Sequence, residues 1–277
     1  MWIRHVEIED FAARLQKDER SAATVEKYRR EVARFAAWLE GREVNQALAL
    51  EYKAQLAESR TPAGVNGAVA ALNKLFLFLE LEGCRLKAVK QQRRIFRDEA
   101  RELTEHEYRR LLAAARRRGN ERLLLVMETV CSTGIRISEL RFFTAESAKR
   151  GRVEVDNKGK RRTVFLPGKL QTLLLRYARK RGIAEGPVFV TRTGRPLDRS
   201  NIWSEMKGLC REAGVEPGKV FPHNLRHLFA RTYYSLEKDI VRLADILGHA
   251  SIETTRIYTM ESGYTHSKQL ERMRLVI

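Results

Sequence analysis

Apolar residues near the start of the chain recur every three or four positions, which is the period of an amphipathic helix. The first apolar stripe lies within residues 8–15. A second lies within residues 25–39, where Ser21 is placed to cap a helix and Gly41 to end it. Two further helices are expected over residues 46–58 and from Pro62 toward Gly83. The pattern predicts an amino-terminal helical bundle.

The helical period lapses after Cys84, in a stretch that is rich in Lys and Arg and poor in groups that build a core. We interpret residues 85–101 as an interdomain linker, which either lies against a phosphate backbone or is a solvated connector. A new helix is expected at Thr104 and Glu107, which have the spacing of a capping box. The predicted domains are therefore residues 1–84 and residues 102–277.

The second domain is mostly helical in its pattern, but one segment alternates in the way that β-strands do. Val153 and Val155 alternate with polar residues, a turn places Lys158 at its tip, and residues 163–166 return as a second strand. Residues 187–190 are expected to add a third strand before helical patterns resume. The predicted fold class is mainly α with a small β-sheet: a helical bundle followed by a mixed α/β domain.

Composition narrows the class of partner. The chain has 53 Lys and Arg against 35 Asp and Glu, a net charge of +18, so a polyanion such as nucleic acid is the expected partner. No apolar run approaches the ~20 residues that span a bilayer, and no signal-peptide pattern opens the chain, so we expect a cytosolic protein without a membrane partner. The three cysteines, Cys84, Cys131 and Cys210, follow no metal-ligand spacing. Neither zinc nor disulfides are expected.

The first candidate motif pairs Arg136 with Glu139. The two lie three residues apart, and we expect Gly134 to open a helix that projects both side chains from one face. A guanidinium fork can hold two phosphate oxygens, while Glu139 would orient that guanidinium or a neighbouring imidazole. The alternative is an ordinary ion pair on a helix surface.

A second motif repeats this spacing in His223 and Arg226. Pro222 precedes the histidine, so the start of a helix and both side chains are expected to face one anion. The apolar residues that follow, Leu225 and Leu228, supply the buried side of the helix. The polar pair is thereby left free to face a cleft.

The third motif lies near the carboxyl end. A helix is expected to stop at Gly248 and to present His249 from its end, and Ser251 is placed to cap the next helix. Tyr258 follows His249 by nine residues, on that next helix or just past it. A tyrosine at such a place is either a packed core residue with a wet hydroxyl or a nucleophile.

Two arginines that keep their charge, two imidazoles and one phenol are what the cutting of a phosphodiester without a metal requires. Taken together, the motifs resemble the tyrosine recombinase family, the lambda-integrase-like enzymes, and most of all its short Xer-type members. They stand in the family's order along the chain. The resemblance implies these catalytic residues: Arg136, Lys158, His223, Arg226, His249 and Tyr258.

By this resemblance, Tyr258 attacks the scissile phosphorus and forms a 3′-phosphotyrosyl link, while the two arginines and the second histidine hold the non-bridging oxygens. Lys158 would protonate the departing 5′ oxygen, with Lys160 as the substitute, and His223 would assist proton transfer. Glu139 would support the phosphate-holding groups. No cofactor and no metal ion are implied. Residues that read bases are not named by the sequence.

The resemblance also implies double-stranded DNA with inverted core-type sites as substrate. It implies a homotetramer, or a pairing with a related recombinase, on synapsed DNA, with accessory factors open. The chain begins directly in the bundle, so an arm-site domain is not expected. The tail over residues 263–277 is expected to dock into a neighbouring protomer, the alternative being packing on its own domain. The expected location is the bacterial cytoplasm, at the nucleoid.

The expected function is DNA integration or excision, or the resolution of chromosome or plasmid dimers. Two other functions stay open at this point. A DNA-binding accessory protein of the same fold needs the charge but not the complete catalytic set. A type IB topoisomerase-like enzyme uses the same chemistry to relax DNA without synapsis.

Overall fold

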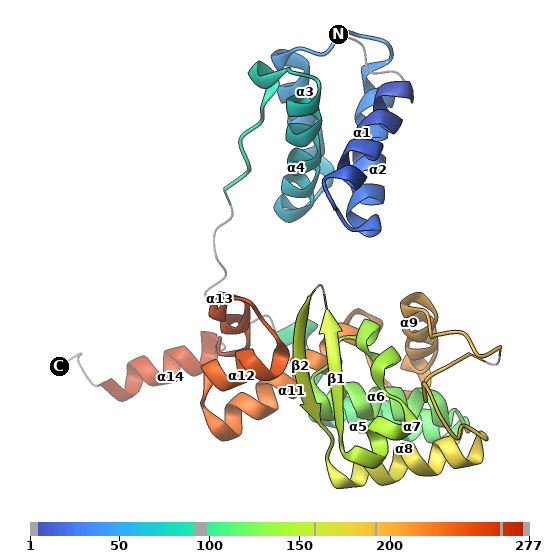
Figure 1. The fold of residues 1–277 in the computed structure, drawn as a ribbon. Coiled ribbons are helices and arrows are strands. Elements are labelled where there is room, and N and C mark those ends of the chain that lie inside the picture. Colours follow the sequence, from blue (N-terminus) through green and yellow to red (C-terminus); the bar gives the residue numbers. More distant parts are fainter. Residues whose placement is uncertain (1–4, 91–98, 158, 192, 261–262, 274–277) are drawn as a thin grey trace. The chain divides into compact units, whose positions relative to one another are not determined.

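The computed structural model describes residues 5–90, 99–157, 159–191, 193–260 and 263–273. The chain divides into two compact units, Met1–Arg93 and Arg94–Ile277 (Figure 1), and each has its own hydrophobic core. The division falls inside the segment that the sequence predicts as a linker. The predicted fold class is confirmed, because helices predominate and the described strands form one small sheet.

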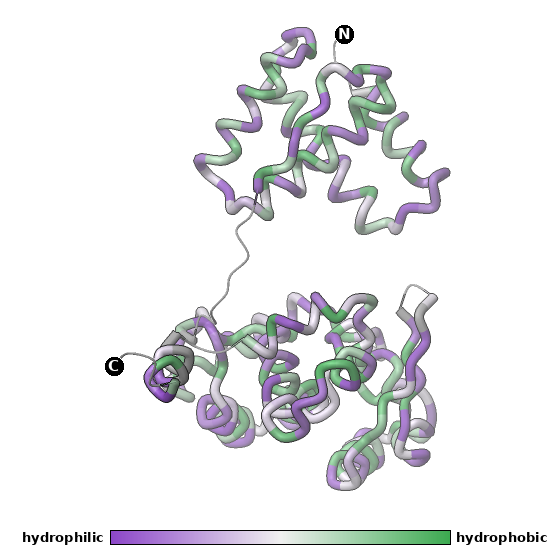
Figure 2. The backbone as a smooth tube through the Cα atoms, turned by 90° about the vertical axis from the view of Figure 1, so that its left-hand side faces the viewer, coloured by the Kyte–Doolittle hydropathy of each residue, from purple (hydrophilic) through white to green (hydrophobic). Residues whose placement is uncertain are grey.

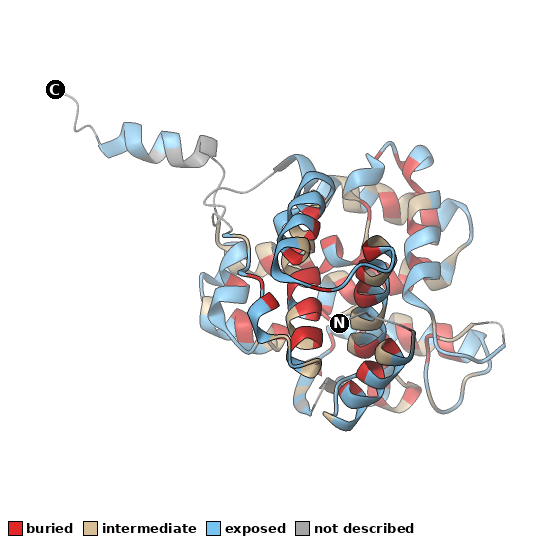
Figure 3. Ribbon diagram, turned by 90° about the horizontal axis from the view of Figure 1, so that it is seen from above, coloured by how far each residue is buried: buried red, intermediate tan, exposed pale blue. Residues whose placement is uncertain are grey.

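The first unit is a helical bundle. Its elements are α1 (His5–Lys17), α2 (Ala22–Leu39), α3 (Gln46–Ser59), α4 (Pro62–Phe78) and the short 3₁₀ helix η1 (Glu82–Cys84). Hydrophobic and hydrophilic residues alternate along these helices (Figure 2), as do buried and exposed ones (Figure 3). Phe35, Leu72 and Phe76 are completely buried where α2 and α4 pack together. The buried aromatic and aliphatic surface is the main force that holds the bundle.

Three helices of this unit, α2, α3 and α4, begin where predicted; α3 ends one residue after the predicted Glu58, and α2 and α4 end earlier than predicted. The Ser21 side chain accepts a hydrogen bond from the first turn of α2, as its position indicates. This helix ends at Leu39, because Glu40 takes the left-handed conformation one residue before the predicted glycine. The fourth helix, α4, ends at Phe78, short of the predicted Gly83.

The segment after Cys84 packs on the bundle, although the sequence indicates few groups there that build a core. Leu86 is buried among the bundle residues. Asn73 of α4 both donates to and accepts from the backbone of Leu86, and Asn66 does the same for Val89. These amides lie two turns apart on one helix face, so they hold an extended backbone as a neighbouring strand would.

The second unit carries the remaining elements. In chain order they are η2 (Glu99–Arg101), α5 (Glu105–Arg117), α6 (Glu121–Thr133), η3 (Ile137–Phe142), α7 (Ala145–Arg150), β1 (Arg152–Asn157), β2 (Lys160–Phe165), α8 (Gly168–Lys180), α9 (Arg199–Gly208), α10 (Cys210–Ala213), η4 (Pro217–Lys219), α11 (Pro222–Glu237), α12 (Ile240–Leu247), α13 (Ile252–Thr255), η5 (Arg256–Tyr258) and α14 (Gly263–Met273). The predicted capping box of Thr104 and Glu107 opens α5. Among the described residues, no helix has the length and apolar character to span a membrane.

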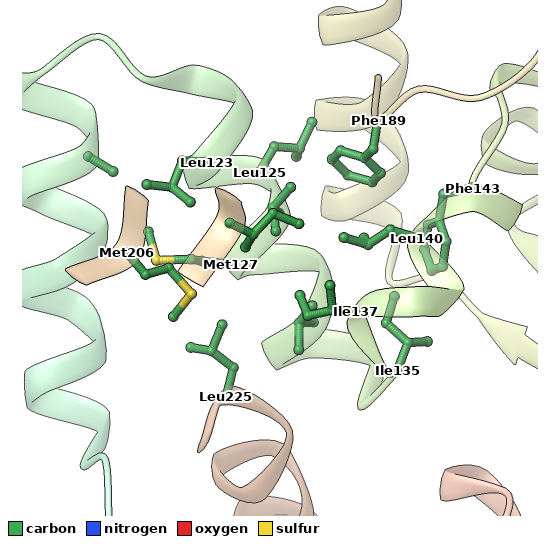
Figure 4. Packing of buried hydrophobic residues seen from close by; sticks show 14 of the residues in the cluster. Leu123, Leu125, Met127, Ile135, Ile137, Leu140, Phe143, Phe189, Met206 and Leu225 are labelled. Carbon is green, nitrogen blue, oxygen red and sulfur yellow. The ribbon is translucent and has the colours of Figure 1, made fainter. Parts of the chain in front are cut away.

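The core of the second unit is centred on α6. Its side chains Leu123 and Met127 are buried beside Met206 of α9 and Leu225 of α11 (Figure 4). Interiors of this kind are close-packed, so elements joined through them hold fixed positions. The packing of α11 against α6 therefore fixes the start of α11 relative to Gly134, which ends α6.

The predicted hairpin is confirmed, and the predicted third strand is wrong. β1 pairs with β2 in antiparallel register, and Val155 is completely buried on its inner face. In the described part of residues 187–196, only isolated bridges form. Val188 donates its backbone N–H to the Phe143 carbonyl, and both Val188 and Phe189 are buried in the core. Their apolar character therefore serves a buried loop and not a sheet.

The expectation that Gly134 opens a helix is also wrong. Gly134 ends α6 in the left-handed conformation, with φ of 66°. A Cβ atom there would lie 2.4 Å from the Phe229 ring, so the position needs a glycine. Arg136 then has an extended backbone, and the 3₁₀ helix η3 follows it. Arg136 and Glu139 still contact each other, because a 3₁₀ helix also brings residues three apart together.

The tail helix α14 is exposed wherever its side chains are described. Leu270 is 54% exposed and Met273 is 56% exposed. Packing of this helix on its own domain, the alternative considered from the sequence, is not what the described side chains show. Residues 274–277 of the predicted tail lie outside the described residues.

Candidate active site

Arg226 lies at the centre of the site. Its side chain projects from the first turns of α11 and is 1% exposed. One guanidinium nitrogen, Nη1, donates to the Gly134 carbonyl at 2.5 Å, and Nη2 donates to the Leu247 carbonyl at 2.8 Å. Burial, together with the charge of Arg136, lowers the pKa of Arg226 to about 10, so the group stays charged at neutral pH. Its Nε is buried without a hydrogen-bond partner in the described part of the chain.

Glu139 holds a second arginine in place. It is 1% exposed and accepts hydrogen bonds from the backbone N–H of Arg136 at 2.8 Å and from its Nη1 at 3.1 Å. Arg162 of β2 donates to both carboxylate oxygens, at 2.9 and 2.8 Å. Although burial opposes it, the hydrogen bonds from Arg162 and Arg136 hold the pKa of Glu139 below its usual value. The carboxylate is therefore an ionised anchor between two cations.

Arg162 has a structural role that the sequence did not reveal. Besides Glu139, its Nε donates to the Ile246 carbonyl in the last turn of α12. It thereby joins the hairpin to the segment that carries His249. Gly248 leaves room for it, because a Cβ atom there would lie 2.9 Å from the Arg162 Cδ. The signal in the sequence is weak, since Arg162 stands in a run of four basic residues, 158 and 160–162 with Gly159 between.

Three of the predicted site residues line one pocket of about 180 Å³: Arg136, His223 and Arg226. Arg199, at the start of α9, lines the same pocket and was not singled out from the sequence. Burial and the charges of the three arginines lower the pKa of His223, so its imidazole is neutral at pH 7. A pocket with such lining attracts an anion with several oxygens.

His249 follows Gly248, which ends α12 as predicted, in the left-handed conformation. Its Nε2 lies 3.0 Å from the Arg226 Nη2, and its Nδ1 lies 2.9 Å from the Thr255 hydroxyl. Because an arginine only donates, Nε2 accepts and Nδ1 carries the proton that bonds to Thr255. Burial and the neighbouring cations, Arg226 first among them, lower the pKa of His249 to about 4. Thr255, completely buried, is a further contact that the sequence did not reveal.

Tyr258 lies in η5, just past the short helix α13 that Ser251 caps. It is 5% exposed, and its ring stacks on His249 with 6.2 Å between the ring centroids. Burial raises the pKa of the Tyr258 hydroxyl, while the charge of Arg226 and its hydrogen bond act in the opposite direction. Tyr258 is thus both a packed residue and a neighbour of the cationic cluster.

The structure brings Arg136, Glu139, His223, Arg226, His249 and Tyr258 into one connected cluster. Lys158, the predicted acid, lies outside the described residues, and so do the side-chain surroundings of its substitute Lys160. Among the described residues, no group of three or more His, Cys, Asp and Glu is placed to hold a metal ion.

Guanidinium and imidazole groups thus cluster next to a tyrosine, on a mainly helical unit whose described strands form one hairpin. The Phage integrase family matches residues 101–263. Tyrosine recombinase XerA of Pyrococcus furiosus is 30% identical over 285 residues, covering 99% of this chain and 96% of XerA.

Solved structures have the same fold. A lambda integrase dimer bound to a COC′ core site has a TM-score of 0.74 at 17% identity, over 94% of this chain and 96% of the integrase chain. A pre-cleavage complex of the XerH recombinase with its difH substrate has a TM-score of 0.70 at 17% identity, over 96% of this chain and 89% of XerH. The chain belongs to the phage integrase family and is a site-specific tyrosine recombinase, an enzyme that cuts and rejoins DNA strands.

Proposed function

We propose that Tyr258 is the nucleophile with which this recombinase cuts DNA. Its hydroxyl oxygen bonds to the scissile phosphorus, and the bond from phosphorus to the 5′ oxygen breaks. The products are a 3′-phosphotyrosyl link and a free 5′-hydroxyl. Attack of a 5′-hydroxyl on that link runs the step backwards, so rejoining conserves the bond and needs no ATP. The contact of Tyr258 with His249 and Arg226 supports this role.

In this proposal Arg136 and Arg226 hold the non-bridging oxygens of the scissile phosphate, and His249 joins them once its Nε2 takes up a proton and donates to the phosphate instead of accepting from Arg226. Negative charge accumulates on those oxygens in the pentacoordinate transition state, and donors that the fold holds in place stabilise it. Each such donor is worth roughly 10²- to 10³-fold in rate. His223 assists proton transfer, and Lys158 protonates the departing 5′ oxygen, with Lys160 as the substitute.

The observation that carries the proposal is the burial of Arg226. Burying a charged guanidinium to 1% exposure, with its Nε unpartnered, lowers the stability of the fold. Two carbonyl oxygens and an imidazole accept hydrogen bonds from its other two nitrogens. None of these acceptors carries a negative charge that would balance the guanidinium. An incoming phosphate supplies the missing charge and the missing acceptor.

The proposed substrate is double-stranded DNA with inverted core-type sites, cut by four copies of this chain or by copies paired with a related recombinase. The net charge of +18 supports a DNA substrate. The exposed apolar residues of α14 support a link between protomers through the tail. Lambda integrase, a structural neighbour, has been solved as a tetramer bound to a Holliday junction. The proposed place of action is the cytoplasm, where such DNA lies.

In this proposal residues 1–84 form a first DNA-binding domain and residues 102–277 the catalytic domain, and residues 85–101 connect the two along the chain. Integration, excision and the resolution of chromosome or plasmid dimers all use the same strand chemistry. The sequence and arrangement of the DNA sites, with any accessory factor, select among them.

For the test, fragments of the source genome that bind to the protein are first selected. Nicked suicide duplexes are then built from their sequences. Cleavage next to the nick releases a short strand, so the covalent intermediate accumulates. We expect the parent protein to form a denaturation-resistant adduct with DNA and the Tyr258→Phe variant to form none. An adduct that survives this change places the nucleophile elsewhere. No adduct from the parent favours a DNA-binding accessory protein, and relaxation of plasmids without strand exchange favours a topoisomerase-like enzyme.

A further inference from the structure

His227 has no role in the mechanism proposed above, yet it lies between two residues that do. Its ring is 4.5 Å from the His223 ring and 5.0 Å from the Tyr258 ring, measured between centroids. The planes of His227 and Tyr258 are almost perpendicular, at 88°. His227 follows Arg226 directly on α11, so the packed helix holds it in place beside the cationic cluster.

The imidazole of His227 is neutral. Burial and the nearby His223, Arg231 and Arg226 lower its pKa to about 3, so at pH 7 it carries one N–H and one lone pair. Its Nε2 is buried and has no hydrogen-bond partner in the described part of the chain. Buried polar atoms are nearly always paired, so an unpaired one requires an explanation, and a role in catalysis is one of the explanations. A phenylalanine would fill the same space without leaving a polar atom unpaired.

The Tyr258 hydroxyl already accepts a hydrogen bond from Arg226, and among the described residues few other groups beside it can accept its proton. Both ring nitrogens of His249 are engaged, one with Arg226 and one with Thr255. The arginines donate hydrogen bonds but accept none. At 5% exposure, Tyr258 must also shift before its oxygen reaches a phosphorus atom. The element that carries it is a short 3₁₀ helix next to a four-residue helix, and such elements move more readily than long packed helices.

We infer that His227 is a positioning residue for the nucleophile: its Nε2 forms a hydrogen bond with the Tyr258 hydroxyl oxygen when that oxygen is brought to the phosphate. Either atom can be the donor, because a hydroxyl and a neutral imidazole both donate and accept. The bond restricts the rotation of the phenol and aims its oxygen at phosphorus. The inference rests on the proposed role of Tyr258.

The variants His227→Phe and His227→Gln distinguish the effect of the ring nitrogen from the effect of the ring's shape. Phenylalanine keeps a flat ring of similar size and removes both nitrogens, whereas the glutamine amide places a polar atom close to the position of Nε2. We expect His227→Phe to form the covalent adduct roughly tenfold more slowly than the parent at saturating DNA, and His227→Gln to stay within about threefold of the parent. DNA affinity should be unchanged in both.

A second reaction tests whether the effect is confined to Tyr258. In a Tyr258→Phe background, a duplex with a 3′-(4-nitrophenyl phosphate) end is joined to a 5′-hydroxyl strand, and nitrophenol is released. This joining uses the phosphate-holding groups but not the tyrosine. We expect it to proceed at the same rate with His227, His227→Phe and His227→Gln.

Three results would overturn the inference: adduct formation by His227→Phe at the parent rate, a glutamine variant as slow as the phenylalanine variant, or equal losses in adduct formation and in joining. The last result would mean that His227 only supports the fold. A parent protein that forms no adduct would instead refute the proposed function of Tyr258, and the inference with it.

Discussion

The change Glu139→Gln tests how the site holds its two arginines. It keeps the size of the side chain but removes the charge, and the new amide N–H₂ faces guanidinium donors. Glu139 accepts hydrogen bonds from the Arg136 backbone and Nη1 and from both Nη atoms of Arg162. The amide retains one acceptor oxygen for these donors. Arg162 also loses the counter-charge that holds it against the Ile246 carbonyl.

The expected loss of unfolding free energy follows from how deeply the three charged side chains are buried. Removing one partner of a buried ion pair costs about 3–5 kcal/mol. The Arg136 side chain is 32% exposed and that of Arg162 is 12% exposed, so water stabilises part of the charge left behind. We therefore expect a loss near the lower end, about 3 kcal/mol, which lowers the melting temperature of a unit of this size by about 6–12 °C. Adduct formation should fall about 100-fold, because Arg136 is no longer fixed.

Glu212→Gln is a matched control, since Glu212 also bridges two arginines, Arg117 and Arg118, but at the surface. Exposed pairs contribute little, so this variant should melt and cleave like the parent. Thermal melting by circular dichroism and adduct formation on the suicide duplex check both expectations. If Glu139→Gln melts at the same temperature as Glu212→Gln and forms adduct at the parent rate, the buried carboxylate does not hold the two arginines in place.

Three further predictions concern the surroundings of the site. Gly134→Ala should lose several kcal/mol more unfolding free energy in urea than Gly119→Ala, because both have positive φ but only the Gly134 Cβ would meet the Phe229 ring; equal losses would contradict this. Thr255→Val should slow adduct formation about tenfold without weakening DNA binding, because the His249 tautomer loses its partner; a parent rate would show that Thr255 does not orient His249. Binding of DNA should take up protons near neutral pH, because a phosphate raises the depressed pKa values of His223 and His249. Affinity should therefore rise as pH falls from 8 to 6, and calorimetry in buffers of different ionisation enthalpy would detect the uptake; no buffer dependence would contradict it.

Local signals allowed the sequence to predict much of the fold. Ser21 and the pair Thr104 and Glu107 mark helix starts through contacts within one turn, and the structure contains those caps. Gly248 ends a helix for the same kind of reason. The described motif residues came together because each stands within or next to the end of a helix that the core fixes in space.

Several of the errors and omissions involve contacts that no short sequence motif encodes. Residues 187–190 are apolar in either a strand or a buried loop, and only the neighbouring core decides between them. Leu86 is buried because two asparagines on another element hold its segment. Arg162 and Thr255 were missed since their partners, Glu139 and His249, lie 23 and 6 positions away and no short motif joins them.

In the proposed function, the Tyr258 oxygen becomes bonded to a DNA phosphorus atom. The most direct measurement is to trap the adduct on a suicide duplex, digest the DNA with nuclease and the protein with protease, and sequence the modified peptide by mass spectrometry. We expect a 3′-phosphonucleotide on Tyr258. A nucleotide attached to any other residue would contradict the proposed function.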